Sequence, residues 1–207
     1  MENRWLARAK RLQAIASTGL HYTEGEFDRE RYREVAEIAN AMLADLGNVP
    51  IERIEGLVSE FAKGYATPKV DVRGALIEDG KILLVREKSD GRWSLPGGFA
   101  DVGRSAAENV AKELHEEAGI SVSVRSLYAV RHMAKGAYKP DPRDFYKLFF
   151  LCEREGAEAP VAGLETTDVA FFSRFDLPEL SQSRVIPDDI EAAFAFHEGS
   201  TPGVIFD

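Results

Sequence analysis

The chain has 207 residues, of which 44% are hydrophobic, and its formal net charge at pH 7 is −9. That length allows one medium domain or two small ones, and the hydrophobic fraction is ordinary for a globular protein. The acidic balance excludes broad nucleic-acid binding driven by phosphate neutralisation, so no DNA partner is expected. It suits an enzyme whose acidic site is screened by metal cations.

Cysteine usage and hydropathy indicate the compartment. The one cysteine, Cys152, rules out an internal disulfide and fits a reducing environment. It lies in the apolar run KLFFLC, so a buried, inert thiol is favoured over a nucleophile. The N-terminal MENRWLARAK lacks the apolar segment of a signal peptide, and no run approaches the ~18 apolar residues of a membrane span. The sequence therefore predicts a cytoplasmic protein with no membrane partner.

Residues 1–66 predict a small, all-helical N-terminal extension built from three helices. An apolar stripe at helical spacing predicts the first over residues 3–17. A capping-box pattern precedes a longer amphipathic helix, which Gly47 and Asn48 end, and Pro50 is expected to begin the third. The stripe consists of Trp5, Ala9, Leu12 and Ala16, the capping box of Thr23 and Glu26, and the inner face of the third helix of Ile51, Ile54, Leu57, Val58 and Phe61.

The sequence pattern allows several roles for this extension. It has too little core to be stable by itself, so its apolar faces are expected to pack on the following domain or on a second copy of the chain. The basic edge of the first helix could touch a membrane or RNA, although a docked helix with a solvated edge is favoured. A DNA-reading helix-turn-helix is disfavoured, because the longest helix carries Glu30, Glu34 and Glu37.

Residues 67–207 predict a layered α/β domain. Apolar runs on either side of Asp79-Gly80 predict a β-hairpin, and Trp93 to Leu95 predict a short strand. Further strands are expected within 120–130, 143–153 and 164–173, with a polar loop over 133–142. Pro187 is expected to open the last helix, with Ile190, Ala193, Phe194 and His197 on one face. Strands that alternate with helices around a mixed sheet give this architecture.

The stretch from Pro96 to Ile120 carries the chemistry. Ser105 and Glu108 match a capping box, so a helix should start near Ser105, and Gly119 should end it. Val110, Leu114 and Ala118 form its expected buried face. The carboxylates at i, i+3 and i+4 share one side of that helix and repel one another; they belong to Glu113, Glu116 and Glu117. A solvated acidic face is the plainer interpretation, whereas a bound cation would remove the repulsion.

The loop before the helix favours the cation. Gly97 and Gly98 allow the backbone to approach a ligand or metal closely, although a Gly-Gly pair alone is weak evidence. Hard carboxylate oxygens suit Mg²⁺ or Mn²⁺, which typically bridge a protein to substrate phosphates. Glu108 has a structural role in the cap and is therefore kept out of the metal site.

This segment resembles the Nudix box, which runs from a glycine through an acid to R-E-U-x-E-E-x-G-U, where U is a large aliphatic residue. The matching residues are Gly98, Glu113, Leu114, Glu116, Glu117, Gly119 and Ile120. Two positions depart, since Arg104 stands for the first acid and Lys112 for the arginine. Arg104 cannot bind a metal, and Lys112 keeps the charge but loses the planar fork of arginine.

The resemblance implies an α/β/α sandwich with a mixed sheet and hydrolysis of nucleoside diphosphates linked to another moiety, with Mg²⁺ or Mn²⁺. It implies a nucleotide-type substrate and a metal site made by Glu113, Glu116, Glu117 and the carbonyl of Gly97. The general base is expected to be Glu116, Glu117 or Glu165; an exposed loop acid is the plainer interpretation of Glu165. Candidate substrate contacts are Arg104, Phe99, His132 and Lys135, of which the charged residues could simply be solvated.

Beyond the box, the helical extension and the phrases WSLPGGFADVG, YKLFFLCE and ETTDVAFF are similar to one Nudix subfamily. Its type activity is hydrolysis of CDP-choline to CMP and phosphocholine, and its members are often labelled ADP-ribose pyrophosphatases. This similarity implies CDP-choline as the first expected substrate of this chain, with ADP-ribose or another nucleotide sugar as the alternative. It also implies a homodimer and a secondary 3′→5′ exonuclease activity on RNA. A choline group would need aromatic neighbours, for which Trp93, Phe99, Tyr138, Phe145 and Tyr146 are available. A catalytically silent binding module remains an alternative because of Arg104 and Lys112.

Overall fold

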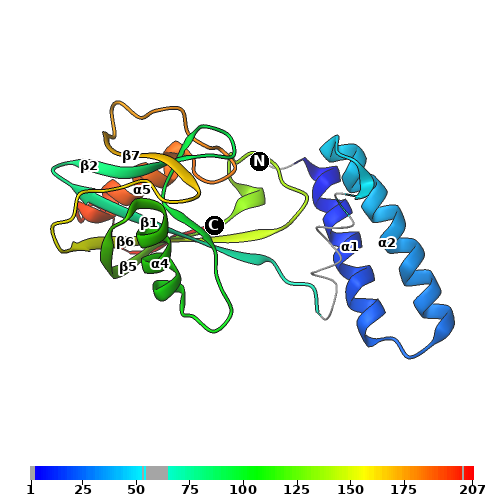
Figure 1. Ribbon diagram of the computed structural model, residues 1–207. Helices are drawn as coiled ribbons and strands as arrows, with labels where there is room; N and C mark the ends of the chain where they lie inside the picture. Colours follow the sequence, from blue (N-terminus) through cyan, green and yellow to red (C-terminus); the bar gives the residue numbers. More distant parts are fainter. Residues whose placement is uncertain (1–2, 53, 55–64, 202) are drawn as a thin grey trace. The chain divides into compact units, whose positions relative to one another are not determined.

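The computed structural model describes residues 3–52, 54, 65–201 and 203–207 (Figure 1). These residues form two compact units. The first is Met1–Lys69 with Pro140–Phe145, and the second is Val70–Lys139 with Tyr146–Asp207. Within the described ranges no helix has both the length and the apolar character needed to cross a membrane.

The first unit is built on two helices, α1 (Arg4–Tyr22) and α2 (Glu26–Gly47). The side chain of Asn3 caps α1 by accepting a hydrogen bond from the Trp5 N–H at 2.8 Å. Asn48, in the left-handed conformation, ends α2 beside Gly47, as predicted. The core of this unit contains Leu6, Ala9, Leu43, Ala44 and Ile54.

Three sequence predictions for this unit need correction. Helix α1 runs beyond residue 17, and its buried stripe is Leu6, Ala9, Ala16 and Ser17, so Trp5 and Leu12 are exposed. The capping box at Thr23 and Glu26 is wrong. The N-cap of α2 is Gly25, and the Thr23 hydroxyl accepts a hydrogen bond from the Gly25 N–H instead.

The predicted third helix lies largely outside the described residues. Within its expected range, the described positions 51, 52 and 54 are helical.

The second unit contains a mixed sheet. Its strands are β1 (Lys69–Glu78), β2 (Lys81–Glu87), β3 (Trp93–Ser94), β4 (Gly97–Phe99), β5 (Ser121–His132), β6 (Phe145–Glu155), β7 (Thr166–Ser173) and β8 (Ile205–Phe206). They lie in the order β3-β2-β1-β6-β5-β8, with β4 paired to β1 and β7 paired to β2. β5 and β8 are parallel, whereas the β1–β2, β2–β7 and β5–β6 pairs are antiparallel.

Two helices cover this sheet on opposite faces (Figure 1). Val110, Leu114 and Ala118 of α4 (Ala106–Ala118) pack with one set of strand residues, and Ile190, Ala193 and Phe194 of α5 (Pro187–His197) pack with the other. Strand residues alternate between the two cores, because successive side chains of a strand point to opposite faces. The prediction of an α/β/α sandwich that follows a helical N-terminal segment in the chain is therefore confirmed.

Local details refine the sequence prediction. Asp79 and Gly80 have φ of 49° and 70°, as the predicted hairpin turn requires. A Cβ on Gly74 would lie 2.4 Å from Leu114 Cδ1, so the missing side chain lets α4 pack on the sheet. The predicted loop at Gly97 is partly strand β4. His197, predicted to share the inner face of α5, is exposed.

Candidate active site

Helix α4 is fixed at both ends by the predicted caps. The Ser105 hydroxyl accepts a hydrogen bond from the Glu108 N–H at 3.2 Å, and the Glu108 carboxylate accepts one from the Ser105 N–H at 2.7 Å. Gly119 ends the helix with φ of 66°. The buried residues Val110, Leu114 and Ala118 set its rotation, as predicted. The three acids of the helix are therefore held in defined positions beside β4.

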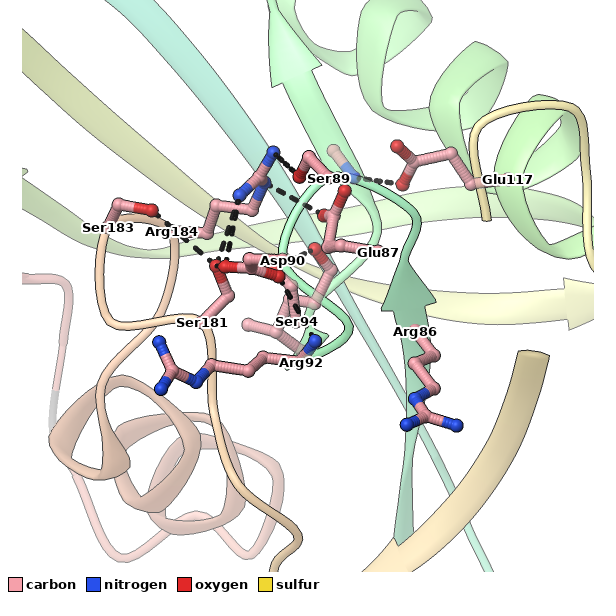
Figure 2. Close-up of polar contacts among 12 residues, drawn as sticks. Arg86, Glu87, Ser89, Asp90, Arg92, Ser94, Glu117, Ser181, Ser183 and Arg184 are labelled. Atoms are coloured by element: carbon pink, nitrogen blue, oxygen red, sulfur yellow. Dashed lines mark hydrogen bonds and ion pairs between the residues drawn. The ribbon is translucent and has the colours of Figure 1, made fainter. Parts of the chain in front are cut away.

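Glu117 is the most enclosed of these acids, with 7% of its surface exposed. Its Oε2 accepts a hydrogen bond from the Gly97 N–H at 2.9 Å (Figure 2). Burial raises the pKa of Glu117 to about 7, against the opposing effects of the Arg73 charge and the Gly97 hydrogen bond. Gly97 has φ of 149°, and a Cβ there would lie 2.1 Å from the Val72 carbonyl oxygen, so only glycine fits.

Glu113 faces the second glycine of the pair. A Cβ on Gly98 would lie 3.1 Å from Glu113 Oε1, so the carboxylate occupies space that any other residue would restrict. Burial raises the pKa of Glu113, and the negative charges of Glu116 and Glu165 act in the same direction, while Lys112 and Arg73 oppose them. The glycine pair thus has two functions, since one glycine orients Glu117 and the other makes room for Glu113.

Glu116 is placed differently from its two neighbours. Its side chain is 55% exposed and forms an ion pair with Lys112 at 3.2 Å. Lys112 also pairs with Asp101 at 3.1 Å. Although lysine lacks the arginine fork, it still ties the helix to the preceding loop and restrains one acid.

The acids meet the chemical requirement for a hard divalent cation but do not form a closed cage. Carboxylate oxygens are the ligands that Mg²⁺ and Mn²⁺ prefer. The glycine cradle beside Glu113 and the excess of buried negative charge fit such an ion. Over the described ranges, however, no three His, Cys, Asp or Glu side chains lie close enough together to hold a metal.

A buried ionic cluster beneath the site was missed at the level of sequence. Arg73, on β1, donates to Asp71 from Nε at 2.9 Å and from Nη2 at 2.8 Å. Its Nη1 donates to the Leu95 carbonyl at 3.1 Å, just before the glycine pair. Lys147 adds a second ion pair to Asp71 at 3.2 Å. The available signal was the i, i+2 spacing of Asp71 and Arg73 within an apolar strand, which places both on one face.

A second missed pair lies at the end of β2. Glu87 is buried, and Arg184 Nε lies 2.9 Å from its Oε1 (Figure 2). The same oxygen accepts no hydrogen bond from a described group, so the contact is an ion pair without hydrogen-bond geometry. Burial raises the pKa of Glu87, with the charges of Asp90 and Glu165 acting in the same direction against Arg184 and Arg73.

Glu165 lies in an exposed segment next to the site. Its backbone carbonyl accepts a hydrogen bond from the Lys88 N–H at 3.1 Å, and its charge contributes to the raised pKa of both Glu113 and Glu87. The following residue, Thr166, donates from its hydroxyl to the Glu117 carbonyl at 2.8 Å. β7 is thereby joined to α4.

The predicted substrate contacts come from two stretches of the chain, one before α4 and one at the end of β5. Arg104 is exposed before the N-cap of α4, and Phe99, at the end of β4, is 43% exposed. His132 packs edge to face on Tyr146, with ring centroids 5.6 Å apart, and Lys135 lies in the short 3₁₀ helix η1 (Met133–Lys135).

Of the five aromatic residues considered for a choline site, three are wholly or partly buried. Tyr138 and Phe145 are buried, and Trp93 packs on Phe172 with ring centroids 4.7 Å apart. Phe99 and Tyr146 are the two that remain exposed. An aromatic pocket for a quaternary ammonium group is therefore not supported by these positions.

The fold and the acid-bearing helix after a glycine pair define a class of pyrophosphate-cleaving hydrolases. Residues 68–193 match the Nudix domain, and the chain belongs to the Nudix hydrolase family. More particularly, residues 3–58 match the UDP-X-like N-terminal oligomerisation domain. The chain is thus a Nudix pyrophosphatase that carries this N-terminal domain.

Three relatives illustrate the similarity. YjhB of Bacillus subtilis (strain 168), provisionally named an ADP-ribose pyrophosphatase, is 42% identical over 207 residues, which cover 100% of this chain and 99% of YjhB. The crystal structure of an ADP-ribose pyrophosphatase from Streptococcus suis 89-1591 is 38% identical, covers 68% of this chain and 100% of its own, and has a TM-score of 0.61. The crystal structure of a UDP-X diphosphatase is 33% identical, covers 98% of both chains and has a TM-score of 0.64.

Proposed function

We propose that the chain hydrolyses the pyrophosphate bond of a nucleoside diphosphate linked to a sugar, with ADP-ribose as the first candidate substrate. The observation that supports cleavage at this site is the hydrogen bond from the Gly97 N–H to Glu117, which orients a buried acid beside the glycine pair. ADP-ribose is supported by the names of two relatives, one of which is similar over the full chain.

The cation-binding residues that we propose are Glu113, Glu116, Glu117 and the carbonyl of Gly97. When bound, Mg²⁺ or Mn²⁺ would neutralise the phosphates and lower the pKa of a water molecule. Glu117 is already oriented by Gly97, and Glu113 has its place beside Gly98. Glu116 would exchange its pairing with Lys112 for the cation. Lys112 would then remain with Asp101 and keep the loop in place.

We assign the general base to the set Glu116, Glu117 and Glu165. Glu117 and Glu165 differ in a way that an experiment can resolve, because one is buried in α4 and the other is exposed on a separate segment. If the base is Glu165, Glu165→Gln lowers kcat while the affinity for Mn²⁺ is retained. Loss of both would indicate that Glu165 serves the cation instead.

The remaining substrate contacts are proposals of the same kind. Arg104, Phe99, His132 and Lys135 are assigned to the nucleotide or its phosphates. For Arg104, Arg104→Ala should raise KM or lower kcat, and unchanged values for both would exclude a phosphate contact. If Arg104 merely replaces a lost acid, Arg104→Glu should instead strengthen metal binding.

CDP-choline is the second candidate, which the subfamily resemblance favours. The burial of Tyr138 and Phe145 weighs against it, since a choline group needs exposed aromatic faces. A panel of ADP-ribose, CDP-choline, a UDP-sugar and a short RNA, each with Mg²⁺ and with Mn²⁺, separates the candidates. The highest kcat/KM on ADP-ribose is expected. Preference for CDP-choline would overturn that choice, and preference for RNA would favour an exonuclease.

A silent binding module is the competing class of function. It predicts no turnover across the panel together with tight binding of one nucleotide.

We further propose that residues 1–66 form a dimerising extension and that 67–207 form the hydrolase domain, which the match of residues 3–58 to an oligomerisation domain supports. Sedimentation of the full chain should give the mass of a dimer.

A further inference from the structure

Arg184 contacts side chains at the end of β2 and in the loop that follows it. Besides the Glu87 contact at 2.9 Å, Nη2 donates to Ser89 Oγ at 3.1 Å and Nη1 lies 3.7 Å from Asp90 Oδ2. Nη1 also donates to Ser181 Oγ at 3.1 Å, and that hydroxyl donates to Asp90 at 2.7 Å (Figure 2). One guanidinium therefore joins the segment around residue 181 to the loop beside the site.

The main electrostatic partner of Arg184 is an enclosed carboxylate. The Glu87 side chain is 6% exposed and that of Arg184 is 28% exposed, so the pair is shielded from water on the Glu87 side. Removing the counter-charge of a buried carboxylate destabilises a protein several times more than removing that of an exposed one. The charge on Glu87 is opposed first by Arg184 and then by Arg73.

Arg73 is already engaged by the rest of the site. Its Nε and Nη2 serve Asp71, and its Nη1 serves the Leu95 carbonyl and Ser94. Its charge also acts on Glu117 and Glu113, the acids that face the glycine pair. If Glu87 had no partner of its own, it would compete with these groups for Arg73.

We infer that Arg184 is a positioning residue for the reaction. It neutralises Glu87 and so leaves Arg73 to orient the Leu95–Gly98 segment and the acids of α4. The inference rests on the proposed cation-dependent site, and it adds residues from two segments that neither the Nudix box nor α4 contains.

A charge-cancelling double variant tests the inference. Arg184→Met should lower kcat by about tenfold or more, because it leaves a buried charge unpaired. The double variant Glu87→Gln/Arg184→Met removes both charges and should recover kcat to within about threefold of the wild type, the coupling expected of residues in contact. Arg184→Lys should fall in between, since it keeps the charge without the fork.

The matched control is Arg92→Met. Arg92 joins the same two segments through Glu179 at 2.8 Å, but this pair is exposed and does not include Glu87. It should retain kcat within about twofold, as expected of an exposed ion pair. If the double variant is folded by circular dichroism yet as impaired as Arg184→Met, Arg184 is a structural clamp and the inference is wrong.

A second measurement separates this inference from the proposed function. Binding of Mn²⁺ alone, followed by electron paramagnetic resonance, does not require turnover. Arg184→Met should weaken Mn²⁺ binding by about threefold, since Arg73 is then drawn to the unpaired Glu87 and no longer orients the acids of α4, and the double variant should return to the wild-type value. If the wild type binds Mn²⁺ but hydrolyses nothing in the panel, the proposed function fails while this comparison still decides the role of Arg184. Unchanged or tighter Mn²⁺ binding in Arg184→Met would contradict the inference.

Discussion

Glu117 Oε2 lies 2.9 Å from the Gly97 backbone nitrogen and accepts its hydrogen bond, which joins helix α4 to strand β4. Gly97 reaches this position only because its φ of 149° and its missing Cβ allow it to approach the Val72 carbonyl. Arg73 donates a hydrogen bond to the carbonyl of Leu95, two residues before Gly97. The orientation of one acid therefore depends on three elements, β1, β4 and α4.

Replacement of Glu117 tests this arrangement directly. Glu117→Gln keeps the size of the side chain and an acceptor for the Gly97 N–H but removes the negative charge. We expect kcat/KM to fall by about 100-fold or more, the scale of losing one charge-stabilising group, with little change in thermal stability. Steady-state kinetics and a thermal melt check both parts. Full activity in this variant would exclude Glu117 from the site.

Replacement of Gly98 tests the cradle for Glu113. Gly98→Ala places a Cβ 3.1 Å from Glu113 Oε1 and should displace the carboxylate. We expect the affinity for Mn²⁺ to fall by about tenfold, the scale of a disturbed support around a metal ligand. Gly74→Ala provides the contrast, because its Cβ meets Leu114 in the core and should cost ~1–3 kcal/mol of unfolding free energy. Isothermal titration and urea unfolding distinguish the two effects.

Variants of the α4 cap residues should change the stability of the protein without changing its catalysis. Ser105→Ala removes the acceptor for the Glu108 N–H and should lower the free energy of unfolding by ~1 kcal/mol, with kcat retained. Glu108→Gln is the matched control, since glutamine also completes a capping box. A large loss of kcat in Glu108→Gln would place Glu108 in the metal site, against its structural assignment.

The sequence predicted the architecture because its signals are local. Asp79-Gly80 between apolar runs, the Ser105 capping box and the spacing of Val110, Leu114 and Ala118 each depend on neighbouring residues, and each is confirmed. Helix boundaries were less certain. The Thr23 and Glu26 pattern has the spacing of a cap, yet the Thr23 hydroxyl accepts a hydrogen bond from the Gly25 N–H and Gly25 is the N-cap of α2.

The surroundings of the acids could not be predicted for a different reason. Arg73 and Glu87 are contributed by separate strands, and Arg184 comes from a segment far along the chain. The contacts of Arg73 with Leu95 and of Arg184 with Glu87 exist only after the sheet has formed, so no spacing in the sequence reveals them. Among the contacts of these side chains, only the Asp71–Arg73 pair has a local spacing that indicates it. The ion pair of Glu116 with Lys112 is also different, because its i, i+4 spacing is a local signal that helical periodicity could have indicated.

Asp189 gives a pH-dependent prediction that does not involve the proposed metal site. Its side chain is fully buried, and it accepts hydrogen bonds from the Tyr138 hydroxyl at 2.7 Å and the Ile186 N–H at 3.0 Å. Lys147 and Arg131 are the positive charges that act on it. Burial nevertheless raises the pKa of Asp189 to about 6 from an ordinary value of 3.8.

Because the folded pKa of Asp189 is the higher one, the folded state binds the proton more tightly than the unfolded state. The contribution of Asp189 to stability is thus fully present below pH 3.8 and is lost as the pH rises through about 6. Asp189→Asn removes this titration, so its free energy of unfolding relative to the wild type should increase between pH 4 and about pH 7. Urea unfolding of both proteins across that range measures the difference. A constant difference would mean that Asp189 binds protons alike in the folded and unfolded states, with Arg131 and Lys147 offsetting the cost of burial.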